Sequence, residues 1–326
     1  MTELVVRAES WPIRGRFAIS RGAKTTADVV LVELKSGAFR GRGECVPYAR
    51  YGESCGSVIE QIESLRPAIQ RGMDRAQLQQ ALLPGAARNA LDCAFWDLQA
   101  KTSGQRVWQL LGLPAPGPMT TVYTLSLDSP ANMHRAAREQ AHRPLLKLKL
   151  AGEGDIDRVC SVREGAPEAR LVVDANEGWD VDTYRTMVPE LLQLGVEMIE
   201  QPLPAAEDGA LQSLPRPIPI CADESCHDSG SLRALVDRYD MINIKLDKAG
   251  GLTEALQLRD SAQAQGMQVM VGCMLATSLA MAPAMLPAQG AAIVDLDGPL
   301  LLERDRQPGL RFDDSRVHPP RPELWG

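Results

Sequence analysis

Apolar and polar residues follow two different patterns along the chain, and the first pattern belongs to its N-terminal part. Residues 2–8 and 29–34 alternate as strands do, and the glycines after them favour a turn and a third strand ending near Glu44. A helical periodicity then extends over residues 57–83 and resumes over 86–98. The pattern predicts an α+β unit of three strands followed by helices.

The borders of this unit are marked by polar stretches and prolines. The stretches near 19–26 and 47–56 are polar, and we expect both to be loops that bear on specificity. A linker follows, made by Pro114, Pro116 and Pro118. The expected organisation is a capping domain over 1–117, a catalytic barrel over 118–300 and a C-terminal segment over 301–326 that returns to the cap.

After the linker, strand-like and helical stretches alternate. Helical patterns cover 130–141, 181–194 and 251–264. The strand-like runs end near Ser126, Lys149, Asp174, Glu200, Asp223, Lys245, Gly272 and Asp295. Eight strands whose ends lie roughly 25 residues apart fit a short (β/α)₈ repeat. The fold class predicted is therefore α/β, a modified TIM-type (β/α) barrel with an α+β capping domain formed by the N-terminal region and the C-terminal tail.

Charged residues stand at the ends of the apolar strands, where such a barrel keeps its active site. Lys147 and Lys149 lie two apart on one predicted strand, so they share a face. Burial and mutual repulsion are expected to lower the pKa of both amines and make a neutral base accessible near pH 7. A solvent-facing edge strand is the rival interpretation.

Three carboxylates follow at the ends of consecutive strands: Asp174, Glu200 and Asp223. Three converging anions repel one another unless a cation joins them, and oxygen ligands favour Mg²⁺ with positions open for substrate oxygens. One such carboxylate alone would more often cap a helix. Three in succession, preceded by the lysine pair and followed by Lys245, favour a metal site.

Composition narrows the class of protein. The 326 residues carry a net charge of −7 without basic blocks, so we expect no nucleic-acid partner. There is no apolar run long enough for a membrane span and no signal-peptide pattern at the start. Seven scattered cysteines without a Cys-x-x-Cys pair fit reduced thiols in a cytoplasmic protein. A homo-oligomer is left open.

Several motifs together resemble a known family, the enolase superfamily, in its subgroup related to muconate cycloisomerase and most closely the dipeptide epimerases that act on L-Ala-D/L-Glu. The resemblance covers nearly the whole chain. It rests on the segments Ile19-Ser20-Arg21-Gly22, Gly43-Glu44-Cys45-Val46-Pro47-Tyr48, Lys147-Leu148-Lys149, Asp174-Ala175-Asn176, Glu200-Gln201-Pro202, Ala222-Asp223-Glu224-Ser225, Asn243-Ile244-Lys245-Leu246-Asp247-Lys248 and Asp295-Leu296-Asp297-Gly298-Pro299.

The resemblance implies an isomerase that uses one Mg²⁺ per subunit, held by the three carboxylates. It also implies a role in murein peptide recycling. The residues support the same chemistry, because a metal ion can stabilise the enediolate formed when a proton leaves the carbon next to a carboxylate. Lys149 and Lys245, from the second and sixth strands, would act as two bases on opposite faces. This is a 1,1-proton transfer, with Lys147 as an electrostatic helper beside the substrate carboxylate.

Substrate recognition follows from charge. Asp295 and Asp297 lie two apart on the last predicted strand and are expected to accept the α-ammonium group, while Arg21 pairs with a side-chain carboxylate. A plain loop charge for Arg21 and a structural cap for Asp295 are the rival interpretations. We expect three further polar residues to support the site rather than act as catalysts: Asn176, Glu224 and Asp247.

The remaining candidates receive structural interpretations. Lys248 is expected to face the outer helices, His227 to be a solvated loop histidine, and Cys273 and Met274 to line the pocket or core. Other reactions of the subgroup stay open: N-succinylamino acid racemisation, o-succinylbenzoate synthesis and muconate cycloisomerisation, although Asp295 and its neighbour would repel their anionic groups. A non-catalytic protein on the same fold is the other alternative, but it would be expected to lose part of the lysine and carboxylate set.

Overall fold

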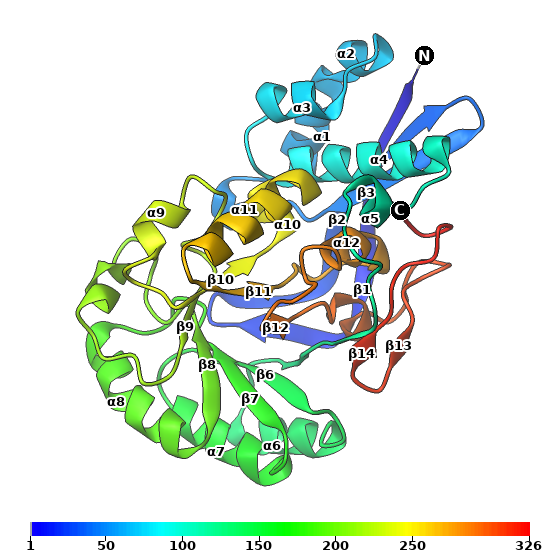
Figure 1. Ribbon diagram of the computed structural model, residues 1–326. Helices are drawn as coiled ribbons and strands as arrows, with labels where there is room; N and C mark the ends of the chain where they lie inside the picture. Colours follow the sequence, from blue (N-terminus) through cyan, green and yellow to red (C-terminus); the bar gives the residue numbers. More distant parts are fainter. Residues whose placement is uncertain (1) are drawn as a thin grey trace.

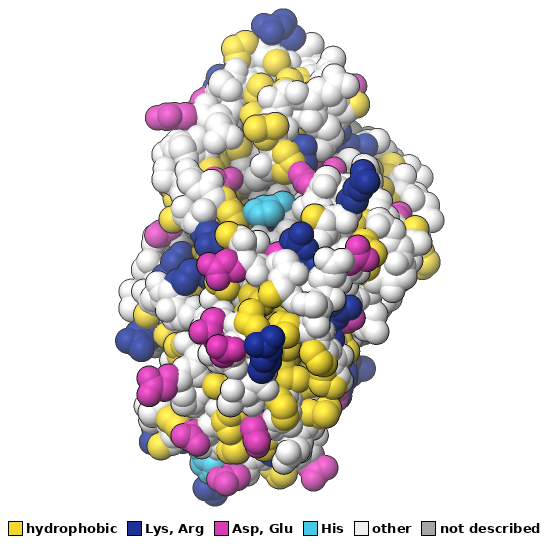
Figure 2. Space-filling model, turned by 90° about the vertical axis from the view of Figure 1, so that its left-hand side faces the viewer, with side chains coloured by type: hydrophobic (Ala, Val, Ile, Leu, Met, Phe, Trp, Pro, Cys, Tyr) yellow, Lys and Arg dark blue, Asp and Glu magenta, His cyan; other side chains and the backbone are white. Residues whose placement is uncertain are grey.

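The computed structural model describes residues 2–326, which form an N-terminal antiparallel sheet with helices, a curled parallel sheet with helices around it, and a C-terminal tail (Figure 1). Among these residues, no helix combines the length and the apolar character needed to cross a membrane. On the face shown in Figure 2, basic and acidic side chains are interspersed, and apolar side chains gather mainly in the lower half.

The N-terminal sheet contains β1 (Glu3–Ile19), β2 (Gly22–Ser36) and β3 (Phe39–Cys45), paired in the order β1-β2-β3. The first two strands are longer than predicted, and the stretch 19–26 is the end of a hairpin rather than a long loop. Backbone pairing continues out to Ile19 and Gly22. The side chains there are largely exposed, so the apolar alternation stops before the strands do.

The helices of this part cover one face of the sheet. They are α1 (Cys55–Ser64), α2 (Arg66–Gln70), α3 (Arg75–Ala81), α4 (Ala86–Ser103) and α5 (Val107–Leu110), after the short 3₁₀ helix η1 (Ala49–Tyr51). The helical stretch predicted over 57–83 is thus three helices, broken at Pro67 and by the left-handed turn at Gly72 (φ 98°). Helix α4 agrees with the prediction and ends at Gly104, which has a φ of 70°.

Close contact between α4 and β3 requires glycine. A Cβ atom at Gly43 would lie 2.0 Å from the carbonyl oxygen of Ala90, and one at Gly41 would lie 2.3 Å from that of Ala94. The helix therefore packs directly on the strand backbone. This packing brings the buried polar side chains of α4 to the border with the barrel.

The parallel sheet confirms the predicted barrel. Its strands are β5 (Tyr123–Leu125), β6 (Leu145–Lys149), β7 (Arg170–Asp174), β8 (Val196–Glu200), β9 (Ile220–Ala222), β10 (Met241–Ile244), β11 (Gln268–Val271) and β12 (Ile293–Val294), and each is hydrogen-bonded to the next. The N–H of Val122 donates to the carbonyl of Val294 at 2.9 Å, so the first and last strands also meet. Each strand ends within one residue of its predicted position.

Helices surround this sheet, as Figure 1 shows. They are α6 (Pro130–Glu139), α7 (Asp155–Gly165), α8 (Val181–Gln193), α9 (Leu232–Leu235), α10 (Leu246–Ala249), α11 (Leu252–Ala264) and α12 (Ser278–Ala284), with the 3₁₀ helices η2 (Asp208–Gln212) and η3 (Gly298–Leu301). The three helices predicted after the linker correspond to α6, α8 and α11.

One end of the barrel is filled by apolar side chains. A buried cluster takes one residue from each strand or its start: Val122, Leu145, Val172, Met198, Cys221, Met241, Met270 and Ile293. Because alternate residues of a strand share a face, the lysines at positions 147 and 149 point into the barrel like Leu145. The packed end supports the opposite end, where the charged residues gather.

The C-terminal tail runs back to the N-terminal part. Its strands β13 (Phe312–Asp313) and β14 (Arg316–Val317) pair with β4 (Met119–Thr120), and Trp325 Nε1 donates to the carbonyl of Cys93 in α4 at 3.0 Å. Figure 1 shows the end of the chain beside α5. These contacts fit a tail that completes the cap, while the exact domain boundaries stay a prediction.

Candidate active site

The predicted lysines and carboxylates lie together at the C-terminal end of the barrel. Lys149, Asp174 and Glu200 end their strands, Lys147 lies two residues before the end of β6, and Asp223 directly follows β9. Lys245 likewise directly follows β10. All six side chains are buried, with residue exposures between 0 and 7%.

Each carboxylate of the trio turns one oxygen toward a lysine. The Nζ–oxygen distances are 2.6 Å for Lys149 and Asp174 Oδ2, 2.6 Å for Lys147 and Glu200 Oε2, 3.2 Å for Lys147 and Asp174 Oδ2, and 2.6 Å for Lys245 and Asp223 Oδ2. We call these three oxygens the inner oxygens. The amines of Lys147, Lys149 and Lys245 therefore place positive charge where the inner oxygens converge.

The pKa of Lys147 runs against the sequence-based prediction. Burial disfavours the charged amine of Lys147, but Asp295, Glu200 and Asp174 outweigh it and raise the pKa well above its usual value. Burial acts in the same way on Lys245, and Asp223 is the main opposing charge that raises its pKa. The prediction counted lysine repulsion and burial but omitted the carboxylates that each amine touches.

The second oxygen of each carboxylate accepts a hydrogen bond from a group other than Lys147, Lys149 and Lys245, and we call these three the outer oxygens. Asp174 Oδ1 accepts from the backbone N–H of Asn176 at 2.9 Å, and Glu200 Oε1 accepts from Asn243 Nδ2 at 2.7 Å. Asp223 Oδ1 accepts from Lys248 Nζ at 2.6 Å.

Lys248 therefore points toward Asp223 from the outer side of the cluster, and the prediction that it faces the outer helices was wrong. Helix α10 begins at Leu246, directly after Lys245. The chain turns helically there, so residues three apart share a side, whereas a continued strand would have put them on opposite faces. Lys248 also donates to the backbone carbonyls of Asp223 at 2.5 Å and Asn243 at 3.0 Å.

The donor set fits a hard divalent cation. One oxygen from each carboxylate of the trio lies within 4.8 Å of the others, and all three residues are buried. Burial and the neighbouring Asp174 raise the pKa of Glu200 to about 7, which shows how unfavourable a third buried anion is here. A cation among the inner oxygens would relieve this repulsion, and oxygen-only donors match Mg²⁺.

A cavity of about 660 Å³ opens above this centre. Lys149, Lys245 and Asp223 lie at its base, and residues of β1, β2 and the 47–56 stretch form its walls. Cys273 and Met274 line it as predicted. The two base candidates, from the second and sixth barrel strands, thus line one cavity.

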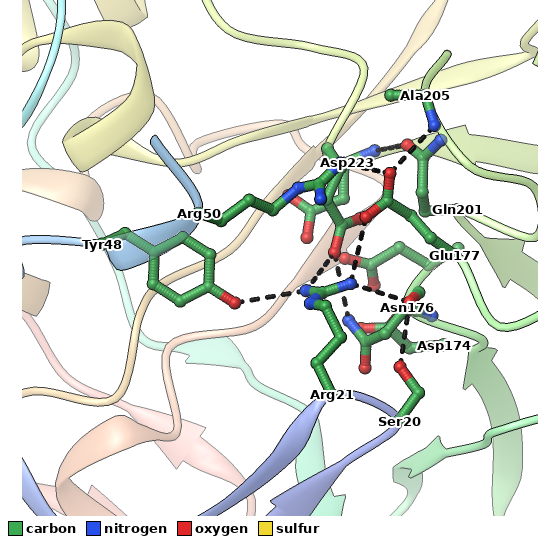
Figure 3. Close-up of polar contacts among 12 residues, drawn as sticks. Ser20, Arg21, Tyr48, Arg50, Asp174, Asn176, Glu177, Gln201, Ala205 and Asp223 are labelled. Atoms are coloured by element: carbon green, nitrogen blue, oxygen red, sulfur yellow. Dashed lines mark hydrogen bonds and ion pairs between the residues drawn. The ribbon is translucent and has the colours of Figure 1, made fainter. Parts of the chain in front are cut away.

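Arg21, at the turn between β1 and β2, reaches across to the barrel (Figure 3). Its guanidinium donates to the carbonyl of Asn176 at 2.7 Å and to Glu177 Oε2 at 3.2 Å. It also donates to Glu224 Oε1 at 2.6 Å and to Tyr48 Oη at 3.2 Å. Burial opposes its charge, but Glu224 and Tyr48 raise its pKa. The donors of Arg21 are thus largely used within the protein.

Two other basic residues line the same cavity and were missed in the sequence. Arg50 forms an ion pair with Glu177, which also pairs with Arg21. Lys24 lies over the Tyr48 ring at 5.7 Å from its centroid, and within residues 2–326 no carboxylate pairs with it. Its position opposite Phe17 in the hairpin is what places it at the cavity, and this register was not visible in the apolar pattern.

Asp295 and Asp297 come just after β12 rather than on it, and they contact different groups. Asp295 Oδ2 lies 2.8 Å from Lys147 Nζ, whereas Asp297 Oδ2 accepts from the backbone N–H of Thr124 at 2.6 Å. Oxygens of both lie within 4.8 Å of the Cys273 sulfur, so they do share one side. Burial, together with repulsion by Asp295, raises the pKa of Asp297 to about 7.

The remaining predicted residues differ in their surroundings. Asn176 and Glu224 adjoin the trio, with Asn176 Nδ2 3.5 Å from Glu224 Oε1. Asp247 instead accepts from Asn89 Nδ2 in α4 at 2.8 Å and from the N–H of Val46 at 2.9 Å, so it joins barrel and cap.

His227 is half-buried, edge-on to the Tyr51 ring with 4.8 Å between centroids, so the prediction of a solvated histidine was wrong. Burial, followed by Lys248, lowers its pKa. Gln201 was quoted within a motif but given no role. Its Oε1 accepts from the N–H groups of Asp223 at 2.9 Å and Ser225 at 3.1 Å, which fixes the turn that carries Asp223.

Comparison with known proteins shows the family of the chain. The family described as mandelate racemase / muconate lactonizing enzyme, N-terminal domain, matches residues 1–112, and the enolase C-terminal domain-like family matches residues 131–323. The chain is 46% identical to the L-Ala-D/L-Glu epimerase of Escherichia coli, over 98% of this chain and 100% of that protein. It is 44% identical to an N-acetyl-D-glutamate racemase of Pseudoalteromonas, over 91% and 95%.

Solved structures are similar over the whole chain. An enolase family member from Agrobacterium tumefaciens with homology to dipeptide epimerases, with bound sodium and L-Ala-L-Glu, has a TM-score of 0.98 and 52% identity over 100% of both chains. A dipeptide epimerase from Enterococcus faecalis complexed with Mg and L-Leu-L-Tyr has a TM-score of 0.90 and 29% identity, over 98% of this chain and 97% of that one. The chain therefore belongs to the mandelate racemase / muconate lactonizing enzyme family of the enolase superfamily, and it is an isomerase.

Proposed function

We propose that the protein epimerises dipeptides of the L-Ala-D/L-Glu type in an Mg²⁺-dependent reaction with two lysine bases. The observation that carries the proposal is that Lys149 and Lys245 line one cavity from different sides of the barrel, next to the three carboxylates. Any substrate carbon held between these amines presents one face to each. Removal of a proton on one face and return on the other inverts the configuration.

The carboxylates of Asp174, Glu200 and Asp223 would hold the ion, one ion for each chain. When bound, Mg²⁺ supplies positive charge that stabilises the negative charge developing on the substrate carboxylate. Lys147 adds a fixed cation at the same place, because Asp295 holds its amine at 2.8 Å. General base catalysis contributes about 10²–10⁴-fold, so this electrostatic stabilisation must supply the larger part of the acceleration.

The charges of the cavity wall favour a substrate with an acidic side chain. Arg21 closes the cap onto the barrel, and Lys24 is the cavity cation without a carboxylate partner among residues 2–326. We propose that these two residues face the glutamate side chain, with Lys24 free to make the direct contact. At the other end, Asp297 and its neighbour Asp295 would accept the α-ammonium group.

A second candidate function is the racemisation of N-acetylglutamate, because one relative at 44% identity has that name. N-acetylglutamate has the same carboxylates and the same α-carbon as an Ala-Glu dipeptide but lacks the ammonium group. The two candidate substrates would interact differently with the buried Asp295 and Asp297. Ionised, they favour an ammonium group, and an acetyl group would leave them without a partner.

The test is proton exchange. The protein with Mg²⁺ is incubated in D₂O with L-Ala-L-Glu or with N-acetyl-L-glutamate, and deuterium at the α-carbon of glutamate and the epimer formed are measured. We expect deuteration and L-Ala-D-Glu from the dipeptide at the higher kcat/KM. Faster racemisation of N-acetylglutamate would establish the second candidate instead, and no exchange with either would refute both.

The biological setting follows from the same proposal. L-Ala-D-Glu type dipeptides derive from cell-wall peptides, so we place the enzyme in murein peptide recycling in the cytoplasm. A deletion strain should accumulate such dipeptides when it is fed cell-wall fragments. Unchanged dipeptide pools would separate the activity from this setting.

A further inference from the structure

The three carboxylates of the trio share an arrangement that the proposed reaction does not require. In each, the inner oxygen faces the lysines and the outer oxygen is held by a donor outside the cluster. The donors to the outer oxygens are the N–H of Asn176 to Asp174 Oδ1, Asn243 Nδ2 to Glu200 Oε1 and Lys248 Nζ to Asp223 Oδ1. We refer to these three donors as the outer anchors.

The outer anchors are rigid. All three N–H bonds of the Lys248 amine are used, since it contacts Asp223 Oδ1 and two backbone carbonyls, and its side chain is 1% exposed. Helix α10, which carries it, ends in carbonyls that accept from Arg88 of α4, at 2.7 Å from Ala249 and 3.1 Å from Gly250. Asn243 is fully buried against Gly272, where a Cβ atom would lie 2.6 Å from its Oδ1.

A carboxylate whose second oxygen is held in this way offers a metal ion one oxygen. Ca²⁺ takes six to eight oxygens and accepts bidentate carboxylates, whereas Mg²⁺ requires near-ideal octahedral geometry with fewer protein ligands. We infer that the outer anchors, Lys248 and Asn243 in particular, hold the trio in one-oxygen ligation and thereby make the centre select Mg²⁺ over Ca²⁺. This inference rests on the proposed metal-dependent function and adds the positioning residues that set its ion preference.

A purely electrostatic role for Lys248 makes a different prediction. Removing its positive charge would strengthen the binding of every divalent ion by a similar factor, because Mg²⁺ and Ca²⁺ carry the same charge. The ratio of the two dissociation constants would then stay constant. Freeing the outer oxygen instead gives Ca²⁺ a further ligand that Mg²⁺ does not use, so the ratio changes.

The experiment measures Kd for Mg²⁺ and for Ca²⁺ by isothermal titration calorimetry, without substrate, in the whole protein and in the variants Asn243→Leu and Lys248→Met. Each replacement is close in size to the residue removed. We expect Kd(Ca²⁺)/Kd(Mg²⁺) to fall about 10-fold in both, at the lower end of what partners of metal ligands contribute. Lys101→Met is the matched control, since Lys101 pairs at 2.7 Å with the buried Asp97 in the cap. Its ratio should not change.

If Lys248→Met fails to fold, Asn243→Leu alone tests the inference, because it changes no charge and leaves the backbone carbonyl that Lys248 uses. A folded Asn243→Leu variant with the parent ratio would overturn the inference. The proposed function fails separately, if the parent protein binds neither ion or exchanges the α-proton equally well without one.

Discussion

The different roles proposed for Arg21 and Lys24 give the most discriminating prediction. Arg21 donates to Asn176, Glu177, Tyr48 and Glu224, so little of its hydrogen-bonding capacity is left for a substrate. Lys24 lies over the Tyr48 ring, has no carboxylate partner among residues 2–326 and lines the same cavity. We therefore expect Lys24→Met to weaken turnover of acidic dipeptides specifically.

The size of the effect expected for Lys24→Met follows from the exposure of the Lys24 side chain. Two unit charges about 4 Å apart interact by roughly 4 kcal/mol at an effective dielectric constant of about 20. The Lys24 side chain is exposed, however, and exposed ion pairs contribute about 0.2–1 kcal/mol when measured. A contact of about 1 kcal/mol, reinforced by the partial cover of the Tyr48 ring, corresponds to a loss of roughly 5-fold in kcat/KM.

The assay compares kcat/KM for L-Ala-L-Glu and for the neutral isostere L-Ala-L-Gln in the parent and two variants. Lys24→Met should lower kcat/KM roughly 5-fold for the acidic dipeptide and leave kcat/KM for the neutral one nearly unchanged. Arg21→Met should lower both, because it leaves the buried Glu224 without its ion-pair partner and releases the hairpin from the barrel. Lys35→Met, an exposed lysine elsewhere on β2, is the matched control.

The reasoning is wrong if Lys24→Met affects the two dipeptides equally. It is also wrong if Arg21→Met affects only the acidic dipeptide, since the arginine would then contact the substrate and the lysine would be a plain surface charge. The ratio between substrates carries the result, so differences in protein stability or active fraction cancel.

Three further predictions concern metal, bases and pH. Chelation should abolish activity and Mg²⁺ restore it, and Asp223→Asn should weaken Mg²⁺ binding in calorimetry; full activity of metal-free protein would contradict this. Lys149→Ala and Lys245→Ala should each stop epimerisation yet still exchange the α-proton of one epimer with D₂O, with opposite preferences by mass spectrometry; a shared preference would exclude opposite faces. Burial, followed by its acidic neighbour, raises the pKa of Asp297 to about 7, and only its ionised form pairs with an ammonium group. The KM for L-Ala-L-Glu should therefore fall as pH rises through about 7, until the ammonium itself titrates near pH 8. Asp297→Asn should remove the change in KM near pH 7 from the pH profile. A profile like that of the parent would make this residue structural.

The barrel was predictable because apolar runs and strand ends coincide there. Most residues of the barrel strands are buried on both faces, so several of these strands are short apolar runs that stop where charge begins, as in residues 171–174. The hairpin of β1 and β2 had no such signal. Its outer part is held by backbone hydrogen bonds with exposed side chains, so residues 19–26 resemble a loop in the sequence although they continue a sheet.

The positions of the site residues followed from the sequence, but their partners did not. Strand alternation places Lys147 and Lys149 on the inner face correctly. It says nothing of which oxygen each amine meets across the barrel, so the predicted direction of the Lys147 pKa shift was wrong. Lys248 was misplaced for a related reason, since the helix that returns it to Asp223 starts only after Lys245.

In the function proposed above, closure of the cap and recognition of substrate charge fall to different residues of one hairpin. Arg21 pairs with Glu224, which is 2% exposed at its side chain, so its position follows from the barrel rather than from the ligand. Lys24 stands three residues further, on a strand whose side chains there point to solvent or to the cavity. A substitution at Lys24 can therefore change the charge that the cavity accepts without loosening the contact that closes it.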